Sequence, residues 1–414
     1  MTKIKLGIAL PLLLALLGCG GNSNENSVTP QNEVVEIYLG SATIPGIGQI
    51  LKIIEDQNDN KKLTTFARHT LPEHIEEKYN AEDSNRANLN SRAFELLSEY
   101  EEEVDVIIHG NTYHHSHVTE LLHNISQLDN VNIKRIEMFD DGIAEYLAMH
   151  SMGETESPEM QEYNLAMGSI HIQASIDNPT VELPVTPAVM YGWHNDYNVR
   201  YNMVRPDYLE INEKIETLAN HIGANSVEMK WDQYAHFSSE QRSDLLDIVG
   251  FNPDDIQELY DASSYDNLIY IGTRDSAACI NKQIQIIRSA ITDEEPIPQL
   301  VKHHDLFYKG HPGEDDTTHN SIVDHFRDEG MMEIDKSIPF EILQMVGLLP
   351  DTIGGMSSTV FMTMPKDADV EIPFIVFNGS SDGNNPQLEI MKTLDIVDDE
   401  QVFYLNDFQD TCQL

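Results

Sequence analysis

Cysteine is scarce in this sequence, which has three cysteines in 414 residues, at positions 19, 279 and 412. They do not combine with histidines in the spacing of a structural zinc site. Nothing in the sequence therefore argues for a fold held by zinc. Cys279 and Cys412 could pair if the chain is exported, although their spacing does not itself indicate a disulfide.

Basic residues are also few: 25 lysines and arginines stand against 70 aspartates and glutamates, a formal net charge of −45 at pH 7. Such a charge argues strongly against nucleic acid as a partner. It is typical of a solvated surface that stays soluble in salt. It also means that any anionic ligand must be held by positive groups placed locally around it.

The apolar run near the N-terminus is too short to span a membrane. Leu6–Leu17 follows Lys3 and Lys5, and this pattern is that of a secretory signal. The sequence therefore predicts export rather than a membrane-spanning helix.

The end of this run, Leu16-Leu17-Gly18-Cys19, resembles a bacterial lipobox. We expect residues 1–18 to be a signal peptide, Cys19 to carry lipid such as palmitate, and residues 19–33 to be a polar tether. The alternative is an ordinary signal with an incidental cysteine. Gly20, rather than Asp, favours the outer membrane, so we predict a membrane-associated lipoprotein of a Gram-negative cell envelope.

Apolar, β-rich runs alternate with helical spacings along the rest of the chain, which predicts parallel sheets with crossover helices. A hydrophobic content of 40% is enough for two cores. The expected strands are 34–39, 104–108, 131–139, 268–272, 306–309 and 373–378. The expected helices are 47–55, 116–124, 142–149, 211–221, 239–249, 281–292, 339–346 and 386–394. The simplest summary is two α/β lobes joined near residue 190, with the proline-punctuated segment Ser151–Pro187 irregular.

Asp140-Asp141-Gly142 follows the third expected strand. Ligands of α/β proteins bind at the carboxyl ends of strands, so a carboxylate here is a candidate catalytic base. Neighbouring side chains of a strand point to opposite faces, so only one of the two aspartates can face a given cleft. The alternative is an N-cap for the next helix, and an Asp-Asp-Gly is also compatible with metal binding.

Lys309-Gly310-His311-Pro312 follows a strand in the second half. His311 can hold or release a proton near neutral pH, and Lys309 can sit against a phosphate. The alternative is a structural turn with a surface histidine. A third element, Gly354-Gly355-Met356-Ser357-Ser358, offers N–H and O–H donors for an anion at an expected helix start.

The cluster His114-His115-Ser116-His117 could bind a transition metal. Its spacing does not place the histidines on one helical face with a second ligand group. We therefore interpret these histidines, and His303-His304, as structural or solvent-facing, with a metal-binding lipoprotein as the alternative.

Together the motifs resemble those of the bacterial sialyltransferases of glycosyltransferase family 80. Phe139–Tyr146 is similar to that family's Tyr-Asp-Asp-Gly-Ser-x-Glu-Tyr, and 309–312 matches its Lys-Gly-His-Pro. Pro339–Leu343 resembles its Ser-Phe-Glu-Val-Leu, and 355–358 resembles its Gly-x-Ala-Ser-Ser. The motifs occur in the family's order, and the resemblance runs from about residue 34 to about residue 405.

The resemblance implies a GT-B fold: two Rossmann-like lobes facing across a cleft, here residues 34–190 and 191–385, with 386–414 returning to the first lobe. It implies inverting, metal-independent transfer of sialic acid (Neu5Ac) from CMP-sialic acid to a galactoside-type glycan, with no cofactor. Asp141 would be the general base and His311 the general acid or the partner of the leaving phosphate. The implied CMP-binding residues are Lys309, Gly310, Pro312, Glu341, Ser357, Ser358, Gly272 and Thr273. The implied residues on the sialic acid and acceptor side are His114, Thr43 and Gly142.

The departures from the family pattern concern the acceptor and sialic-acid side, not the CMP side. Ser276 stands where the family has a tryptophan that packs on the acceptor sugar, within Gly272-Thr273-Arg274-Asp275-Ser276. Ile143 replaces the usual Ser. The nucleotide donor is therefore better predicted than the acceptor, and a different CMP-nonulosonic acid is an alternative donor. A lipid-anchored solute-binding protein is the alternative from another class.

Overall fold

The structure is a computed structural model that describes residues 32–263, 266–274, 278–292, 297, 304–365, 368–381 and 383–408. The expected signal peptide, the lipidation site Cys19 and nearly all of the expected tether lie outside the described residues, as does Ser276. Residues 33–408 belong to one compact unit that contains two parallel sheets.

The first lobe is built on a parallel sheet of seven described strands in the order β3-β2-β1-β4-β5-β6-β7. The strands are β1 Glu33–Gly40, β2 Lys61–Phe66, β3 Ala81–Asp83, β4 Val104–Asn111, β5 Val131–Phe139, β6 Val199–Met203 and β7 Ser226–Glu228. The helices are α1 Thr43–Glu55, α2 Glu73–Tyr79, α3 Leu89–Ser98, α4 Ser116–Ile125, α5 Ile143–Thr155, α6 Pro158–Asp177, α7 Pro187–Met190, α8 Asp207–Ile211, α9 Glu216–Ile222, α10 Gln233–His236 and α11 Ser239–Val249. Short 3-10 turns are η1 Trp193–Asn195, η2 Glu213–Ile215 and η3 Gly223–Asn225.

The second lobe is built on a parallel sheet of six described strands in the order β10-β9-β8-β11-β12-β13. The strands are β8 Asp266–Ile271, β9 His304–Lys309, β10 Met332–Ile334, β11 Thr352–Met356, β12 Ile375–Phe377 and β13 Val402–Tyr404. The helices are α12 Pro253–Ala262, α13 Ile280–Ile291, α14 Asp316–Phe326, α15 Phe340–Met345, α16 Val360–Thr363 and α17 Pro386–Thr393, and the 3-10 turns are η4 Arg327–Glu329, η5 Asp399–Gln401 and η6 Leu405–Asp407. The expectation of two Rossmann-like α/β lobes is confirmed.

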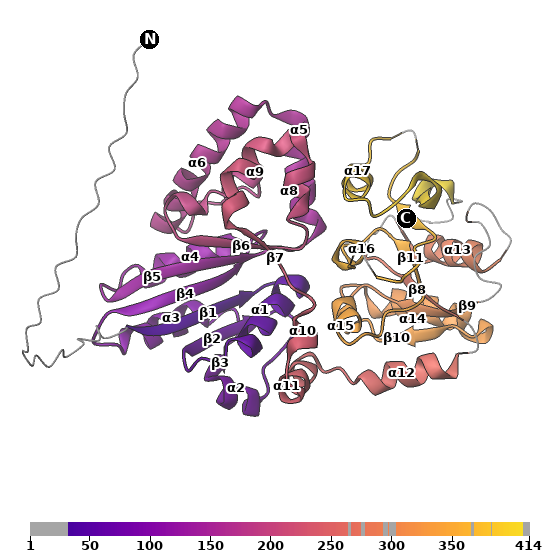
Figure 1. Cartoon of the computed structure of the whole chain (residues 1–414), viewed down its shortest axis with the longest axis horizontal. Helices are drawn as coiled ribbons and strands as arrows, with labels where there is room; N and C mark the ends of the chain where they lie inside the picture. Colours follow the sequence, from indigo (N-terminus) through magenta and orange to yellow (C-terminus); the bar gives the residue numbers. More distant parts are fainter. Residues whose placement is uncertain are drawn as a thin grey trace, which may run out of the picture. The chain divides into compact units, whose positions relative to one another are not determined.

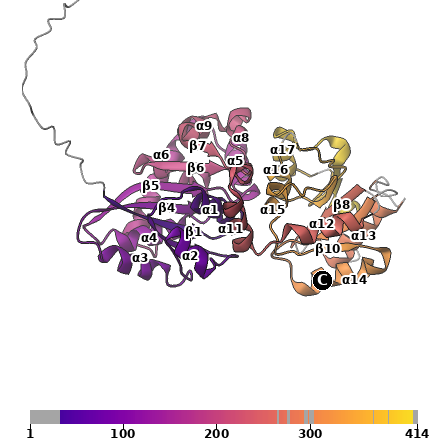
Figure 2. The same cartoon turned by 60° about the horizontal axis from the view of Figure 1, so that its bottom comes forward.

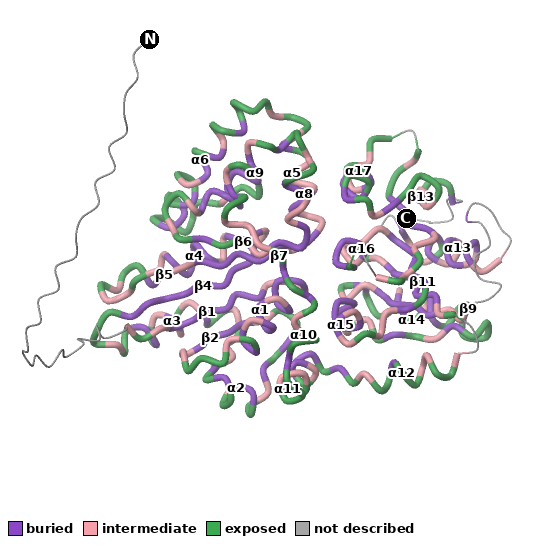
Figure 3. The backbone as a smooth tube through the Cα atoms, viewed as in Figure 1, coloured by how far each residue is buried: buried purple, intermediate pink, exposed green. Residues whose placement is uncertain are grey.

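The central strands of the first sheet carry its core. Ile37 of β1 pairs with Ile108 of β4, which pairs in turn with Ile136 of β5. All three are fully buried, and Figure 3 shows the inner strands buried while the outer turns of the helices are exposed. Each such side chain contributes about 1.5–3 kcal/mol through its removal from water. Side chains buried on both faces are typical of parallel sheets.

The prediction that the two lobes join near residue 190 is wrong. β6 pairs with β5, and β7 pairs with β6, so both strands extend the first sheet. The chain enters the second lobe only after α11, at residues 250–252, as Figures 1 and 2 show. Gly250 ends α11 with a φ of 64°, and Pro253 begins α12. These helix stop and start signals mark the true boundary.

The segment Ser151–Pro187 is not irregular. It contains the end of α5 and the 20-residue helix α6. The Ser157 side chain caps α6 by accepting a hydrogen bond from the Met160 N–H, and Pro158 occupies the first turn. A proline that follows a serine begins a helix here rather than interrupting one.

The C-terminal segment divides between the lobes. Helix α17 contacts α5, and the Arg205 guanidinium donates a hydrogen bond of 3.3 Å to the Leu394 carbonyl. The expected return to the first lobe is found for this helix. β13, in contrast, pairs with β12 at the edge of the second sheet.

Both sheets are parallel throughout, and each reverses its strand order once. In the first sheet the order reverses between β1 and β4, and in the second between β8 and β11. Parallel α/β sheets bind ligands outside the carboxyl ends of the strands at such switch points. We therefore expect the ligand-binding site at the loops that follow these strands.

Candidate active site

One cleft of about 770 Å³ is lined by residues from both lobes. Its first-lobe wall follows the ends of β1, β2, β4 and β5, and its second-lobe wall follows β8, β9 and β11 together with the start of α15. The lining residues include Thr43, Arg68, His114, Asp141, Gly272, Arg274, Lys309, Gly310, His311, Pro312, Glu341, Ser358 and Thr359. Most of the residues that the sequence analysis selected thus meet in a single cleft.

The two adjacent aspartates have different environments. Asp140 is buried, and its carboxylate accepts hydrogen bonds from the Gly142 N–H (2.6 Å), the Tyr146 hydroxyl (2.5 Å) and the Val204 N–H (2.9 Å). Asp141 lines the cleft. The geometry therefore leaves Asp141 as the aspartate that can meet a ligand, which the residues alone did not decide.

The Asp141 carboxyl has a pKa suited to a general base that works at neutral pH. Burial raises the pKa of Asp141 to about 7, and the charge of Asp140 also raises it, while the nearby Asn111 amide and the charge of Arg68 lower it. His114 Nε2 lies 3.9 Å from Asp141 Oδ2. A carboxylate with such a pKa can accept a proton from a hydroxyl more readily than an ordinary aspartate.

Gly142 shapes the start of α5 at the contact between the lobes. Its φ of 88° is a conformation that favours glycine, and a Cβ there would lie 2.3 Å from the Thr359 Cγ2 atom. The next residue, Ile143, donates its N–H to the Thr359 hydroxyl at 3.3 Å. Gly142 therefore permits the backbone turn that follows Asp141 and the close approach of Thr359. It does not itself line the cleft.

His311 is held in one neutral tautomer. Its Nδ1 accepts a hydrogen bond of 2.9 Å from the Gly313 N–H, so Nε2 carries the proton of the neutral ring. Burial lowers the pKa of His311 to about 4, and the charges of Arg68, Arg274 and Lys309 lower it further. Without an anion in the cleft the imidazole is therefore neutral at pH 7 and can donate from Nε2.

Lys309 lies beneath the turn that carries His311. It is 3% exposed, and its Nζ donates to the carbonyls of Gly310 (3.1 Å) and Lys336 (2.9 Å). Burial lowers the pKa of Lys309 to about 8, although the charge of Glu341 opposes this shift. The ammonium both ties the turn together and contributes positive potential to the cleft.

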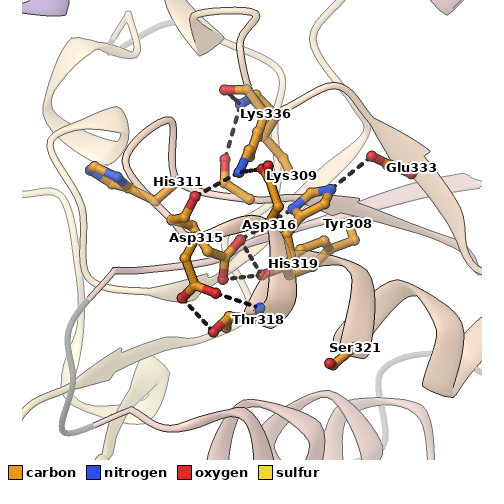
Figure 4. Close-up of polar contacts among 12 residues, drawn as sticks. Tyr308, Lys309, His311, Asp315, Asp316, Thr318, His319, Ser321, Glu333 and Lys336 are labelled. Carbon is orange, nitrogen blue, oxygen red and sulfur yellow. Dashed lines mark hydrogen bonds and ion pairs between the residues drawn. The ribbon is translucent and has the colours of Figure 1, made fainter.

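A network centred on the buried Glu314 carboxylate packs against the same turn, and Figure 4 labels its members Tyr308, His319 and Glu333. Glu314 is 4% exposed, and its oxygens accept from the Tyr308 hydroxyl at 2.9 and 3.0 Å and lie 3.2 Å from His319 Nδ1. His319 Nε2 lies 2.7 Å from Glu333. A Cβ on Gly310 would lie 2.5 Å from a Glu314 oxygen, so the network fits closely against the backbone before His311. Figure 4 shows the imidazole of His311 projecting away from this group.

Glu314→Ala is expected to lower the free energy of unfolding by about 3 kcal/mol, because it leaves the buried donors of Tyr308 and His319 unpaired. The control is Asp315→Ala, which removes only an exposed helix cap and should cost about 1 kcal/mol. Urea unfolding of both variants measures the difference. Equal losses for the two variants would show that the network does not stabilise the turn.

The other second-lobe candidates divide into two groups. Glu341 and Gly272 line the cleft, and burial raises the pKa of Glu341, which is 4% exposed. Ser358 also lines the cleft, but Ser357 does not, because its hydroxyl donates to Gln387 Oε1 at 3.1 Å. Helix α16 has four residues and begins only at Val360, so the serines do not start a helix that could bind an anion at its N-terminus. Thr273 does not line the cleft.

The histidine cluster does not come together as a metal site. His115 is buried and its Nδ1 donates to the Thr112 carbonyl at 3.0 Å, while the rings of His114 and His117 stack with centroids 5.7 Å apart. Within the described residues, no group of three or more His, Cys, Asp or Glu side chains is placed to bind a metal ion. His304 begins β9, and its neighbour His303 lies outside the described residues.

Two arginines of the cleft have roles that the sequence analysis did not assign. Arg68 follows β2, a strand that was not predicted because Lys61, Lys62 and two threonines hide its buried character. Arg274 appeared only as a departure from the family pattern, and its side chain lies beside Gly313 and the His311 ring. The charges of both arginines lower the pKa of His311. They provide the local positive groups that an anionic ligand needs in a chain of net charge −45.

Solved structures of other proteins resemble the whole described fold. A galactoside α-2,3-sialyltransferase from Photobacterium phosphoreum is 33% identical, with a TM-score of 0.83 over 92% of this chain and 100% of that chain. A 2,6-sialyltransferase from Photobacterium sp. JT-ISH-224, solved with CMP and lactose, is 26% identical, with a TM-score of 0.79 over 90% of this chain and 78% of that chain. The GT-B domain of a Photobacterium damselae sialyltransferase is 26% identical, with a TM-score of 0.78 over 90% and 99% of the two chains.

Sequence comparison gives the same assignment. No sequence among the curated proteins matches this chain. The model of the family described as sialyltransferase PMO188 matches residues 35–400. The solute-binding alternative is therefore wrong. The chain belongs to this family of bacterial sialyltransferases and is a glycosyltransferase with the GT-B fold.

Proposed function

We propose that the protein transfers sialic acid (Neu5Ac) from CMP-sialic acid to a hydroxyl of a galactoside-type glycan, with inversion at the anomeric carbon and no need for a metal. The observation that carries the proposal is the placement of Asp141 and His311 on the two walls of one cleft. The related 2,6-sialyltransferase that was solved with CMP and lactose supports this choice of donor and acceptor.

Asp141 is the general base in this proposal. The acceptor oxygen forms a bond to the anomeric carbon while its proton passes to the Asp141 carboxylate. Asp141 lies on the first-lobe wall, and the phosphate leaves from the second-lobe wall beside His311. The acceptor oxygen therefore attacks the anomeric carbon from the side opposite the departing phosphate. This arrangement favours a single displacement with inversion.

His311 assists the departure of CMP. The bond between the anomeric carbon and the phosphate oxygen breaks, and negative charge grows on that phosphate. A hydrogen bond from His311 Nε2 and the positive potential of Lys309, Arg68 and Arg274 stabilise this charge. These donors are held in place before the reaction, so little reorganisation is needed.

The remaining second-lobe residues would bind the nucleotide. Glu341, at the start of α15, is placed to accept hydrogen bonds from ribose hydroxyls. Its buried carboxylate also accepts a hydrogen bond of 3.4 Å from the Thr363 hydroxyl. Gly272, Gly310 and Pro312 form the backbone surface against which the nucleotide packs. We assign the phosphate contact to Ser358 rather than Ser357, and His114 and Thr43 to the sugar side of the cleft.

Incubation with CMP-Neu5Ac and lactose tests the reaction. Proton NMR of the product should show a sialoside of the configuration opposite to that of the donor, and EDTA should leave the rate unchanged. Retention of configuration, or activity that disappears with EDTA and returns with a divalent cation, would contradict the proposal. Other CMP-nonulosonic acids in the same assay distinguish the donor sugar.

We also propose that the protein is a lipoprotein anchored through Cys19. Two features support the proposal: the lipobox-like sequence, and a disulfide at Cys279, a bond that is typical of exported proteins. The described residues contain no helix that is long and apolar enough to cross a membrane. Cys19→Ser expressed in a Gram-negative host should move the protein from the membrane fraction to the soluble envelope fraction and abolish labelling by palmitate. Unchanged fractionation would contradict the anchor.

A further inference from the structure

Glu145 carries a buried carboxyl group that has no part in the mechanism above. It lies in the first turn of α5, at the third helical position, and its side chain is fully buried (Figure 1). Its Oε2 accepts a hydrogen bond of 2.7 Å from the backbone N–H of Asp141, the proposed base. Its other oxygen, Oε1, has no donor among the described residues. A side chain inside the lobe thus holds the backbone of a residue that faces the cleft.

The contact of Glu145 with the backbone is that of a helix cap, shifted by one residue. A glutamate at the third helical position commonly reaches back to the free N–H of the N-cap residue. Here the N-cap is Gly142, whose N–H is taken by Asp140, and Glu145 takes the N–H of Asp141 instead. The cap is therefore shared by two carboxyl groups, and it holds the residue in front of the helix as well as the helix itself.

The groups that face Glu145 do not offset a negative charge on it. They are Asp140 and Asp141 at the end of β5 and Tyr191 after α7. The closest arginine in this network is Arg205, whose backbone N–H reaches the hydroxyl of the residue after Glu145, but its guanidinium pairs with Asp207. An ionised carboxylate is costly to bury without a cation or several donors, so this environment favours the neutral acid.

The carboxyl groups of Glu145 and Asp140 are in hydrogen-bonding contact. Two carboxyl groups this close cannot both be ionised, so a proton lies between them. Asp140 keeps the charge, because its oxygens already accept three hydrogen bonds, whereas Glu145 accepts one from Asp141. Burial and the charge of Asp140 both raise the pKa of Glu145 well above its ordinary value. Oε1 of Glu145 is then the protonated oxygen, which donates a hydrogen bond rather than accepting one.

We propose that Glu145 is a positioning residue for Asp141: as a neutral carboxylic acid it donates to Asp140, accepts from the Asp141 N–H, and so fixes the base without adding a second negative charge beside it. The inference rests on the sialyl transfer proposed above and on Asp141 as its base. An ionised Glu145 would raise the pKa of Asp141 above 7. Asp141 would then be protonated at neutral pH and could not accept the acceptor proton.

The kinetic test compares Glu145→Ala with Glu145→Gln. Alanine releases the Asp141 N–H, so kcat should fall roughly 10²-fold while KM for donor and acceptor changes less than about threefold, because a displaced base costs rate rather than binding. Glutamine keeps an acceptor for the Asp141 N–H and offers its own N–H to Asp140, so it should recover most of that loss. The matched controls are Glu154→Ala and Glu154→Gln, because Glu154 lies on the same helix and pairs with Lys214 at the surface.

The pH profile of Glu145→Gln separates a neutral acid from a carboxylate. If the wild type has a neutral acid at this position, the glutamine variant keeps the midpoint of kcat/KM near 7. If the wild type has a carboxylate, glutamine removes a negative charge from beside Asp141 and the midpoint falls, which would overturn the proposal. Equal kcat for the alanine variant and the wild type, or equal losses for alanine and glutamine, would also overturn it.

Infrared difference spectroscopy provides a readout that needs no substrate. At pH 9 Asp141 is ionised, because its pKa is about 7, whereas Glu145 should keep its proton. The wild type minus Glu145→Gln should therefore show the C=O stretch of a protonated carboxyl group. Absence of this band would overturn the proposal, even if the alanine variant does not fold. Failure of the wild type to transfer to any acceptor while the band is present would instead contradict the proposed function, so the two failures are distinguishable.

Discussion

Asp141→Asn is expected to lower kcat/KM for sialyl transfer about 10³-fold, because the amide has the shape of the carboxylate but cannot accept the acceptor proton. The protein should remain folded, since the Asp141 side chain lines the cleft rather than holding the core. Initial rates with CMP-sialic acid and lactose measure the loss. A variant that keeps more than about a tenth of the wild-type value would show that proton removal does not depend on this residue.

Asp140→Asn is the matched control, and its expected effect is on stability. The Asp140 carboxylate accepts three hydrogen bonds, from Gly142, Tyr146 and Val204. An amide nitrogen in place of one oxygen sets donor against donor, which should cost about 3 kcal/mol of unfolding free energy. The two neighbouring variants should therefore separate: one loses activity, and the other mainly loses stability.

The difference in unfolding free energy between Asp141→Asn and the wild type should also depend on pH in a defined direction. The folded pKa of Asp141, about 7, lies above the unfolded value of 3.8, so its stabilising contribution is complete below pH 4 and is lost as the pH rises through 7. Asparagine removes this dependence. Relative to the wild type, the variant should therefore become more stable between pH 4 and pH 7 and keep that advantage at pH 8, as urea unfolding at pH 5 and pH 8 can measure.

Substitution of His311 is expected to have the second large effect, and two amides separate its functions. His311→Asn keeps an acceptor near the Nδ1 position, which Gly313 contacts, but loses the Nε2 proton, so kcat should fall about 10²–10³-fold. His311→Gln places an N–H near the Nε2 position and should lose less. Initial rates of both variants at saturating donor give the comparison. A larger loss for glutamine than for asparagine would contradict a donor role for Nε2.

The pKa of His311 should rise when nucleotide binds. In the protein alone, burial and the charges of Arg68, Arg274 and Lys309 hold this pKa at about 4. The phosphate of CMP brings negative charge next to these cations and favours the imidazolium. NMR titration of the ring signals with and without CMP measures the shift, and an unchanged pKa would place the phosphate away from His311.

The sequence predicted the chemistry of the site better than its surroundings. Lys309 and His311 are recognisable because they lie in a short motif after a strand, where α/β proteins place ligands. Glu341, in α15, is recognisable only through the family motif that Pro339–Leu343 resembles. Arg68 could not be selected, because its strand reads as polar. The cleft is formed by turns far apart in the sequence, and no local pattern shows that Thr43 and Arg274 line one cavity.

The lobe boundary shows a different limit of sequence patterns. β6 and β7 are five and three residues long, and β7 is partly exposed, so neither has a strong apolar signal. Their membership of the first sheet depends on pairing with β5, which is a tertiary property. The same holds for Ser357, whose hydroxyl is directed to Gln387 of α17 rather than to the cleft.

The most direct test of the account is the pH dependence of acceptor-dependent CMP release by the wild type and by Asp141→Asn. For the wild type, kcat/KM should rise with pH to a plateau, with a midpoint near 7 that belongs to Asp141. The variant should run about 10³-fold lower and lack that rise. A variant with the wild-type rate and the same midpoint would contradict the assignment of Asp141 as the base and, with it, the mechanism proposed for the cleft.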